Sequence, residues 1–234
     1  MLKVSIAENI ENIRKEISRI TVSSGRKPED ILLIVVTKTQ SAEAVNEALE
    51  SNIKDIGENR VQEAKEKFPG LALGNYRRHM IGHLQTNKSK DAVKLFGMIQ
   101  SVDSVRLLAE IDKESKKNGK VMECLVEVNI GGEESKSGMK PEEVEAFILS
   151  AGKFANIKIS GLMTIAPFLD DPEQVRPYFK RMKALFDTIS KLSVKNVKME
   201  HLSMGMSGDF KVAIQEGATM IRVGTAIFGK RQYT

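Results

Sequence analysis

The stretch that decides the fold is ILLIVVTKT, at residues 31–39. Its first six residues are all aliphatic, which is typical of a β-strand buried on both faces of a parallel sheet. The polar segment that contains Lys38 follows directly, and Ser41 can then cap the first turn of a helix. The stretch therefore predicts a strand, a polar tip and a helix, in that order.

The same order recurs along the rest of the chain. Strands are predicted at residues 31–36, 53–57, 78–82, 98–102, 121–129, 157–165, 197–202 and from 219 to about 228. The intervening helices include residues 58–67, 86–95 and 209–216, and others begin after residues 41 and 172 and near residues 104 and 141. Such units, joined by right-handed crossovers, predict an α/β fold: a (β/α)8 TIM barrel that forms one domain over residues 1–234. The structural alternative is a doubly wound open sheet.

An additional helix is predicted before the first strand. Ile6, Ile10, Ile13, Ile17 and Ile20 are spaced by four and three residues, which places them on one face of a helix. Only a short segment follows the eighth predicted strand. We therefore expect the N-terminal helix to cover the barrel surface where a regular eighth helix would pack.

The composition excludes several classes of protein. The chain has 36 basic and 31 acidic residues, and the resulting net charge of +5 suits an anionic ligand. The basic residues lie among acidic ones, however, and tryptophan is absent. Nucleic-acid binding is therefore not expected. The single cysteine, Cys124, excludes an intramolecular disulfide and a thiolate metal cluster. No apolar run is long enough to span a membrane or to act as a signal segment, so we expect a cytoplasmic protein.

In a barrel, function is expected at the C-terminal ends of the strands. These predicted ends carry Lys38, Glu58, Asn59, His83, Ser101, Asp103, Asn129, Thr164, Ser203, Ser207 and Arg222. A lysine that is removed from water at the barrel mouth favours its neutral amine, which attacks carbonyl carbons. Position alone does not decide between this role for Lys38 and an ammonium group that extends into solvent.

Two loops with glycines and hydroxyls follow the last two predicted strands, at residues 203–209 and 222–225. Glycine lets the backbone approach an anion closely, and these loops are the usual phosphate site of a TIM barrel. Either loop alone is a weak signal, because most such loops are turns. Together with Lys38 they predict a ligand that carries an aldehyde and a phosphate.

The three histidines do not form a metal-binding pattern, because they share no helical spacing and no CxxC or HExxH motif accompanies them. We expect His79 and His201 to be structural. His83, just after Gly82 at a predicted strand end, is a candidate for the barrel mouth.

Ordered motifs along the whole chain resemble one known family. They are VTK at 36–38, GENRVQE at 57–63, HMIGHLQTNK at 79–88, VNI at 128–130, ESKSG at 134–138, GLMT at 161–164, HLSMGMSGD at 201–209 and RVGTAIFG at 222–229. On these motifs the chain resembles the YggS/PROSC family of pyridoxal phosphate homeostasis proteins, whose barrel is related to the N-terminal domain of alanine racemase.

The resemblance implies a pyridoxal 5′-phosphate (PLP) site. It places an aldimine on Lys38, Asn59 near the cofactor, Ser203, Gly224 and Thr225 at the phosphate, Arg222 at the pyridine nitrogen and a secondary cofactor site at Lys136; His83 is a further candidate contact. An arginine cannot give the ring nitrogen a full proton, so the cofactor would be a weaker electron sink than with an aspartate partner.

The implied function is PLP (vitamin B6) homeostasis by a cytoplasmic monomer. It would hold PLP without strong turnover and supply it to PLP-dependent apo-enzymes. Two alternatives share Lys38 and the phosphate loops: a PLP-dependent amino-acid racemase and a Schiff-base aldolase that acts on sugar phosphates.

Overall fold

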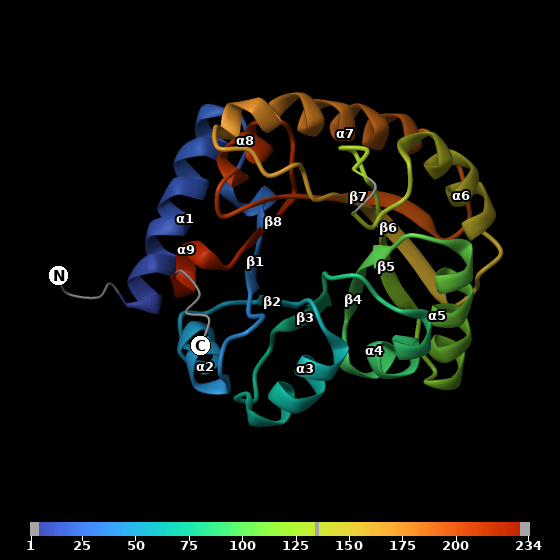
Figure 1. Cartoon of the computed structure of the whole chain (residues 1–234), viewed down its shortest axis with the longest axis horizontal. Coiled ribbons are helices and arrows are strands. Elements are labelled where there is room, and N and C mark those ends of the chain that lie inside the picture. The colour runs from blue at the N-terminus through green and yellow to red at the C-terminus, as the bar shows by residue number, and fades with distance from the viewer. Residues whose placement is uncertain (1–4, 134–135, 230–234) are drawn as a thin grey trace.

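The computed structural model describes residues 5–133 and 136–229. At its centre, eight parallel strands form a closed barrel in the order β1 to β8, and β1 pairs with both β2 and β8. The strands are β1 (Leu32–Val36), β2 (Asp55–Glu58), β3 (Arg77–Met80), β4 (Met98–Val102), β5 (Met122–Glu127), β6 (Ile157–Met163), β7 (Val197–Met206) and β8 (Met220–Val223). Closure confirms the predicted barrel and excludes the open sheet (Figure 1).

Helices surround the barrel (Figure 1). The α-helices are α1 (Ile6–Ser23), α2 (Ala42–Glu50), α3 (Val61–Lys67), α4 (Ser89–Leu95), α5 (Val105–Lys117), α6 (Val144–Ala151), α7 (Arg176–Ile189), α8 (Phe210–Gln215) and α9 (Thr225–Phe228). Short 3-10 helices are η1 (Pro28–Asp30), η2 (Phe68–Gly70), η3 (Thr86–Lys88), η4 (Pro141–Glu143) and η5 (Pro172–Val175). None of the described helices is long and apolar enough to cross a membrane.

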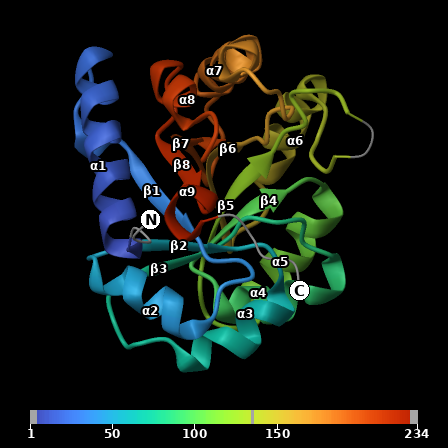
Figure 2. The same ribbon diagram turned by 60° about the vertical axis from the view of Figure 1, so that its left-hand side comes forward.

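Helix α1 is the predicted additional helix. Ser5 caps it, because the Ser5 hydroxyl accepts from the backbone N–H of Glu8 and the Glu8 carboxylate accepts from Ser5. The predicted apolar face is buried against the barrel, and α1 packs on α2, α8 and α9 (Figure 2). The amide of Asn9 also donates to the carbonyl of Ile227, at 2.8 Å. This helix therefore covers the gap beside β1 and β8, as expected.

Two predicted strand ends were wrong by four residues or more, whereas the other boundaries shifted by at most two. The eighth strand ends at Val223, not near Phe228, because the chain turns at Gly224 and the carbonyl of that glycine accepts from the N–H groups of Ile227 and Phe228. The seventh strand extends beyond residue 202 to Met206, because Ser203 still pairs with Met163 of β6. Ser203 therefore lies inside a strand and not in a loop.

The apolar core has two parts. A larger cluster fills the space between the outer face of the barrel and the helices. A smaller cluster lies inside the barrel and consists of Ile34, Met98, Leu125, Met163 and Met220. Side chains from five of the eight strands thus fill the barrel as a packed core, and the space for a ligand is confined to its ends.

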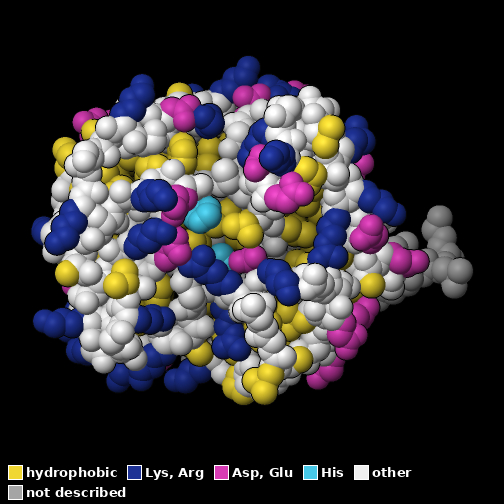
Figure 3. Space-filling model, turned by 180° about the vertical axis from the view of Figure 1, so that it is seen from behind, with side chains coloured by type: hydrophobic (Ala, Val, Ile, Leu, Met, Phe, Trp, Pro, Cys, Tyr) yellow, Lys and Arg dark blue, Asp and Glu magenta, His cyan; other side chains and the backbone are white. Residues whose placement is uncertain are grey.

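Charged side chains of both signs lie together on the surface. On the face seen from behind in Figure 3, acidic side chains lie among basic ones near histidine. One such cluster joins Glu123 to Arg77 and Lys158, and Lys158 also to Glu200. Glu123, Glu200 and His201 have the spacing of a metal site, but the basic partners of the two carboxylates account for their charges.

The contact between β6 and β7 requires glycine at position 161. A Cβ atom there would lie 1.8 Å from the carbonyl oxygen of His201, a backbone atom of the paired strand, so the two strands would have to separate locally. We expect Gly161→Ala to lower the free energy of unfolding by at least about 1–3 kcal/mol in urea denaturation, since it forces an atom into a packed contact. Gly208→Ala is the matched control, because a Cβ atom at Gly208 meets nothing within 4 Å. Equal stability of the two variants would contradict this account.

Candidate functional site

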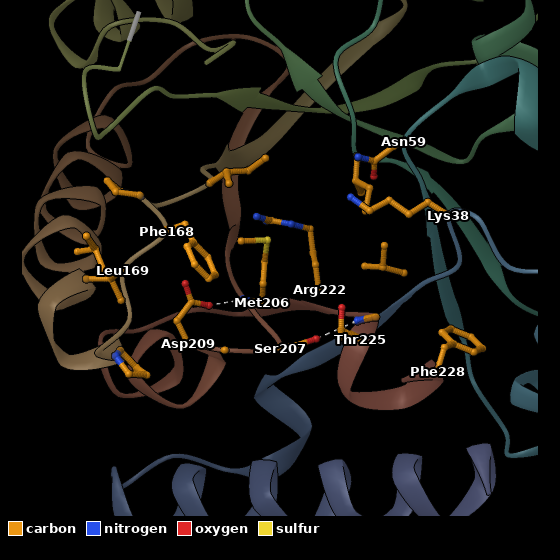
Figure 4. A pocket seen from close by; sticks show the side chains of 18 of the residues that line it. Lys38, Asn59, Phe168, Leu169, Met206, Ser207, Asp209, Arg222, Thr225 and Phe228 are labelled. Carbon is orange, nitrogen blue, oxygen red and sulfur yellow. Dashed lines mark hydrogen bonds between the residues drawn. The ribbon is translucent and has the colours of Figure 1, made fainter. Parts of the chain in front are cut away.

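A cavity of about 530 Å³ opens at the C-terminal ends of β1, β2, β7 and β8. Lys38 and Asn59 lie on one side of it and Phe168 and Leu169 on the other, with Arg222 between them (Figure 4). Ser207, Gly224 and Thr225 complete its wall beside α9. The cavity therefore brings together residues from both ends of the sequence, as closure of the barrel requires.

Lys38 occupies a tight turn after β1. The N–H of Gln40 donates to the carbonyl of Thr37 and closes the turn around Lys38 and Thr39. The Lys38 side chain is half-buried and extends into the cavity near Asn59 (Figure 4). Asn59 follows β2 and packs closely on Gly82, where a Cβ atom would lie 2.4 Å from the Asn59 carbonyl oxygen. Gly82 is thus needed to place the tip of β2.

Arg222 is the buried cation of the cavity. Its guanidinium donates to the hydroxyl of Ser203 and to the carbonyl of Thr164, both at 2.7 Å. Burial lowers the pKa of Arg222 to about 10, and the carboxylates of Asp209 and Glu127 oppose that shift, so the guanidinium is charged at neutral pH. Two of its five N–H groups are used in these bonds, and the others can donate into the cavity.

A chain of hydrogen bonds through the barrel interior holds Arg222. Ser203 accepts from Arg222 and donates to the Gln100 side-chain oxygen at 2.7 Å, and the Gln100 nitrogen lies 3.1 Å from His79 Nδ1. His79 Nε2 lies 2.8 Å from the Asp55 carboxylate. Gln100 can only donate to Nδ1, so His79 is neutral and carries its proton on Nε2. Burial accordingly lowers the pKa of His79.

The loops after β7 and β8 bring two backbone N–H groups together at one hydroxyl. The backbone N–H groups of Gly224 and Ala226 both point at the Ser207 hydroxyl, at 3.3 and 3.2 Å (Figure 4). Gly224 also packs on β1, where a Cβ atom would lie 3.1 Å from the Val36 carbonyl oxygen. Two convergent N–H groups beside a hydroxyl suit a phosphate group, whose oxygens accept several hydrogen bonds.

The opposite wall of the cavity is apolar and was missed by the sequence analysis. Ile165, Pro167, Phe168, Leu169, Pro172 and Val175 line it, all from the segment between β6 and α7. Phe168 is 89% exposed, an unusual position for a large aromatic side chain. The only signal in the sequence is the apolar stretch at residues 166–169, directly after the predicted sixth strand, to which the sequence motifs assign no role.

Three predicted contacts lie outside the cavity wall. The hydroxyl of Ser203 is buried between Arg222 and Gln100, so Ser207 and not Ser203 faces the cavity. His83 is exposed and lies 3.4 Å from Asp103, at a separate polar groove. Lys136 pairs with Glu133 at 2.6 Å and donates to the carbonyl of Ala166, so it joins the loops after β5 and β6. Glu134 and Ser135, from the same motif, lie outside the described residues.

Two carboxyl groups near Arg222 have raised pKa values. Burial and, to a smaller extent, the nearby Asp103 carboxylate raise the pKa of Glu127 and Arg222 opposes them, which leaves that pKa at about 7. One Glu127 oxygen is buried and has no hydrogen-bond partner among the described residues. Burial also raises the pKa of Asp209, whose carboxylate accepts from the N–H of Met206.

Comparison with known proteins identifies the family. Residues 5–232 match the alanine racemase N-terminal domain. The pyridoxal phosphate homeostasis protein of Aquifex aeolicus (strain VF5) is 40% identical over 230 residues, which cover 98% of this chain and 100% of that protein. The chain belongs to the pyridoxal phosphate homeostasis protein family. The resemblance that the sequence motifs indicated is thereby confirmed.

Solved structures share this fold. The structure of PipY from Synechococcus elongatus PCC7942 with PLP bound is 31% identical, with a TM-score of 0.84 over 96% of this chain and 100% of that chain. An alanine racemase of Clostridium difficile 630 is 19% identical, with a TM-score of 0.68 over 98% of this chain and 57% of that chain. The racemase likeness shows the shared barrel alone.

The hydrogen-bond chain to Arg222 depends on Gln100. Gln100→Leu removes the partner of Ser203 and of His79 in the barrel interior, and we expect it to lower the free energy of unfolding by about 2–4 kcal/mol. Chemical denaturation measures the change. The neighbouring Ser101 is the control, because its buried hydroxyl has no hydrogen-bond partner among the described residues and Ser101→Ala should be nearly neutral. A loss of equal size in Ser101→Ala would refute the importance of the chain.

The raised pKa of Glu127 predicts a pH-dependent stability. The folded-state pKa of about 7 exceeds the ordinary value of 4.5, so the protonated carboxyl stabilises the fold at low pH and this contribution is lost as the pH rises from 4.5 through 7. Relative to Glu127→Gln, the wild-type free energy of unfolding should fall by roughly 1–3 kcal/mol over this range, and then stay constant. Denaturation at a series of pH values tests this. A difference that does not vary with pH would show that Glu127 does not titrate there.

Proposed function

We propose that this chain binds PLP in the cavity at the C-terminal ends of β1, β7 and β8 and serves in PLP homeostasis. The observation that carries the proposal is the meeting of an amine, a buried guanidinium and a phosphate cradle in one cavity. The names of the relatives and the PLP-bound PipY structure support the same ligand. The aldehyde, the pyridine nitrogen and the phosphate of the cofactor would thus each have a partner of suitable chemistry.

Three polar groups of PLP are assigned to residues of the cavity. The phosphate would accept from the N–H groups of Gly224 and Ala226, with Ser207 and Thr225 beside it. Arg222 would donate to the pyridine nitrogen, and Asn59 would lie beside the ring near Lys38. The aldehyde carbon would bond to Nζ of Lys38 as an imine, with loss of one water molecule. Ser203 would then act indirectly, by holding Arg222.

Arg222 as the partner of the pyridine nitrogen favours a protein that holds the cofactor over an enzyme with strong turnover. PLP supplies an electron sink that depends on protonation of its ring nitrogen. Arg222 keeps its protons, because even with the lowered pKa of about 10 it is a far weaker acid than a pyridinium ion. The bond between Lys38 and the aldehyde is reversible, so the cofactor can be released again.

The remaining parts of the proposal concern the cellular role. We propose a cytoplasmic monomer that supplies PLP to apo-enzymes and binds neither nucleic acid nor membranes. The mixture of acidic and basic side chains in Figure 3 supports the last point for that face. A racemase activity would instead convert one enantiomer of an amino acid into the other, which chiral analysis of the products would detect.

The assignment of Lys38 predicts a spectroscopic change. Wild-type protein mixed with PLP should show an imine absorption band and, after reduction with borohydride, a stable adduct on the Lys38 peptide. Lys38→Ala should lose both, because the primary amine is removed from the cavity. Absorption spectra and peptide mass mapping measure the two effects.

The matched control is Lys136→Ala, whose side chain does not line the cavity. It should keep the absorption band and the Lys38 adduct. A wild-type protein that takes up no PLP, or an adduct found only at Lys136, would overturn the proposed site. Racemisation of an added amino acid that Lys38→Ala abolishes would favour the enzyme alternative.

A further inference from the structure

Lys67, the last residue of α3, is a buried lysine whose ammonium group faces away from the cavity. Only 7% of its side chain is exposed, and it is not among the residues that line the cavity. Its Nζ atom donates to the carboxylates of Glu58 and Glu63, at 2.7 Å each. Burial of an ammonium group is costly unless it is fully paired, so a position this deep requires a function in holding the structure.

The third partner of Lys67 belongs to the turn that carries Lys38. Lys67 Nζ donates to the carbonyl oxygen of Thr37 at 2.7 Å, and that oxygen also closes the turn by accepting from Gln40. The hydroxyl of Thr37 in turn donates to the same oxygen of Glu58 that binds Lys67, at 2.7 Å. The residue immediately before Lys38 is therefore fixed at both its backbone and its side chain.

The residue immediately after Lys38 is fixed by the same cluster. The backbone N–H of Thr39 donates to the Glu63 oxygen that also accepts from Lys67. Thr39 has a φ of 63°, in the left-handed region that a β-branched residue rarely adopts. A strained residue of this kind persists only where the surroundings hold it. The bond from Thr39 to Glu63, itself held by Lys67, supplies that restraint.

Lys67 lies at the centre of a charge cluster that it forms with Glu58 and Glu63. One ammonium group lies between two carboxylates, so its removal leaves Glu58 and Glu63 near each other without a cation. Burial raises the pKa of Glu58, and the bonds from Lys67 and Thr37 oppose that shift. Glu58 and Glu63 both belong to the GENRVQE motif, in which Asn59 alone was given a role by the sequence analysis.

We propose that Lys67 is a positioning residue for Lys38: it holds the turn at Thr37–Gln40 so that the Lys38 amine reaches the aldehyde of the bound cofactor. This inference rests on the proposed function, because it concerns the covalent bond to Lys38. Lys67 makes no contact with the cofactor itself. It follows that loss of Lys67 weakens the covalent part of binding and spares the phosphate cradle, which lies on the loops after β7 and β8.

The test compares two ligands on Lys67→Met. PLP can form the imine, whereas pyridoxine 5′-phosphate has an alcohol in place of the aldehyde and binds through its phosphate and ring alone. We expect the variant to bind PLP roughly 10- to 100-fold more weakly, since small misplacements of a reacting group have effects of this size. Its affinity for pyridoxine 5′-phosphate should change less than about twofold, within the variation expected of surface substitutions. Calorimetric titration measures both affinities.

Two further variants complete the experiment. Lys65→Met, on the same helix but 58% exposed, is the control and should bind both ligands like wild type. Glu63→Ala removes the carboxylate that accepts from the Thr39 N–H. Because the Glu63 side chain is less buried than that of Lys67, this variant tests the same turn if Lys67→Met does not fold. Glu63→Ala should also weaken the binding of PLP more than that of pyridoxine 5′-phosphate.

Each outcome has a defined meaning. Selective loss of PLP binding in Lys67→Met, or in Glu63→Ala if the former does not fold, supports the positioning role. Equal loss of both ligands, or loss of neither, overturns it. If wild type and Lys38→Ala bind PLP equally well, the proposed function fails instead, because Lys38 then forms no bond with the cofactor.

Discussion

Closure of the parallel sheet is the constraint on which the rest of the structure depends. Because β1 pairs with β8 as well as with β2, the turn after β1 lies beside the loops after β7 and β8, although more than half of the chain separates them. All strands run in the same direction, so their C-terminal ends meet at one mouth. An open sheet with the same strands would have left Lys38 and Gly224 apart.

The closed barrel must also bury polar groups, and it does so in connected chains. Arg222, Ser203, Gln100, His79 and Asp55 bond in sequence from the cavity into the barrel interior. Each of these residues has a partner in the next, which lowers the cost of burying polar groups in an apolar interior. The same bonds restrict the guanidinium to one orientation. Packing and the geometry of the ligand site therefore depend on the same residues.

Lys38 and Lys67 show how one residue type serves two purposes in adjoining environments. Lys38 is half-buried and extends into the cavity, where an amine can react. Lys67 is buried behind the same turn, where its three bonds fix the backbone on either side of Lys38. Residues 57–67 thus contribute Asn59 to the cavity and a supporting cluster behind it. A reactive amine on a turn needs such support, since a turn has few packing contacts of its own.

The sequence by itself determined the barrel, the additional helix and the positions of Lys38, Asn59 and Arg222 near strand ends, because aliphatic runs and polar tips are local patterns. Only the tertiary structure decided which side chains face the cavity. Ser203 lies within β7 and bonds inside the barrel, whereas Ser207 follows the end of that strand and lines the cavity, and pairing with β6 and β8 sets where β7 ends. Lys67 looked like an ordinary lysine at a helix end. Its burial depends on contacts with β1 and β2, and no local pattern records contacts between segments so far apart.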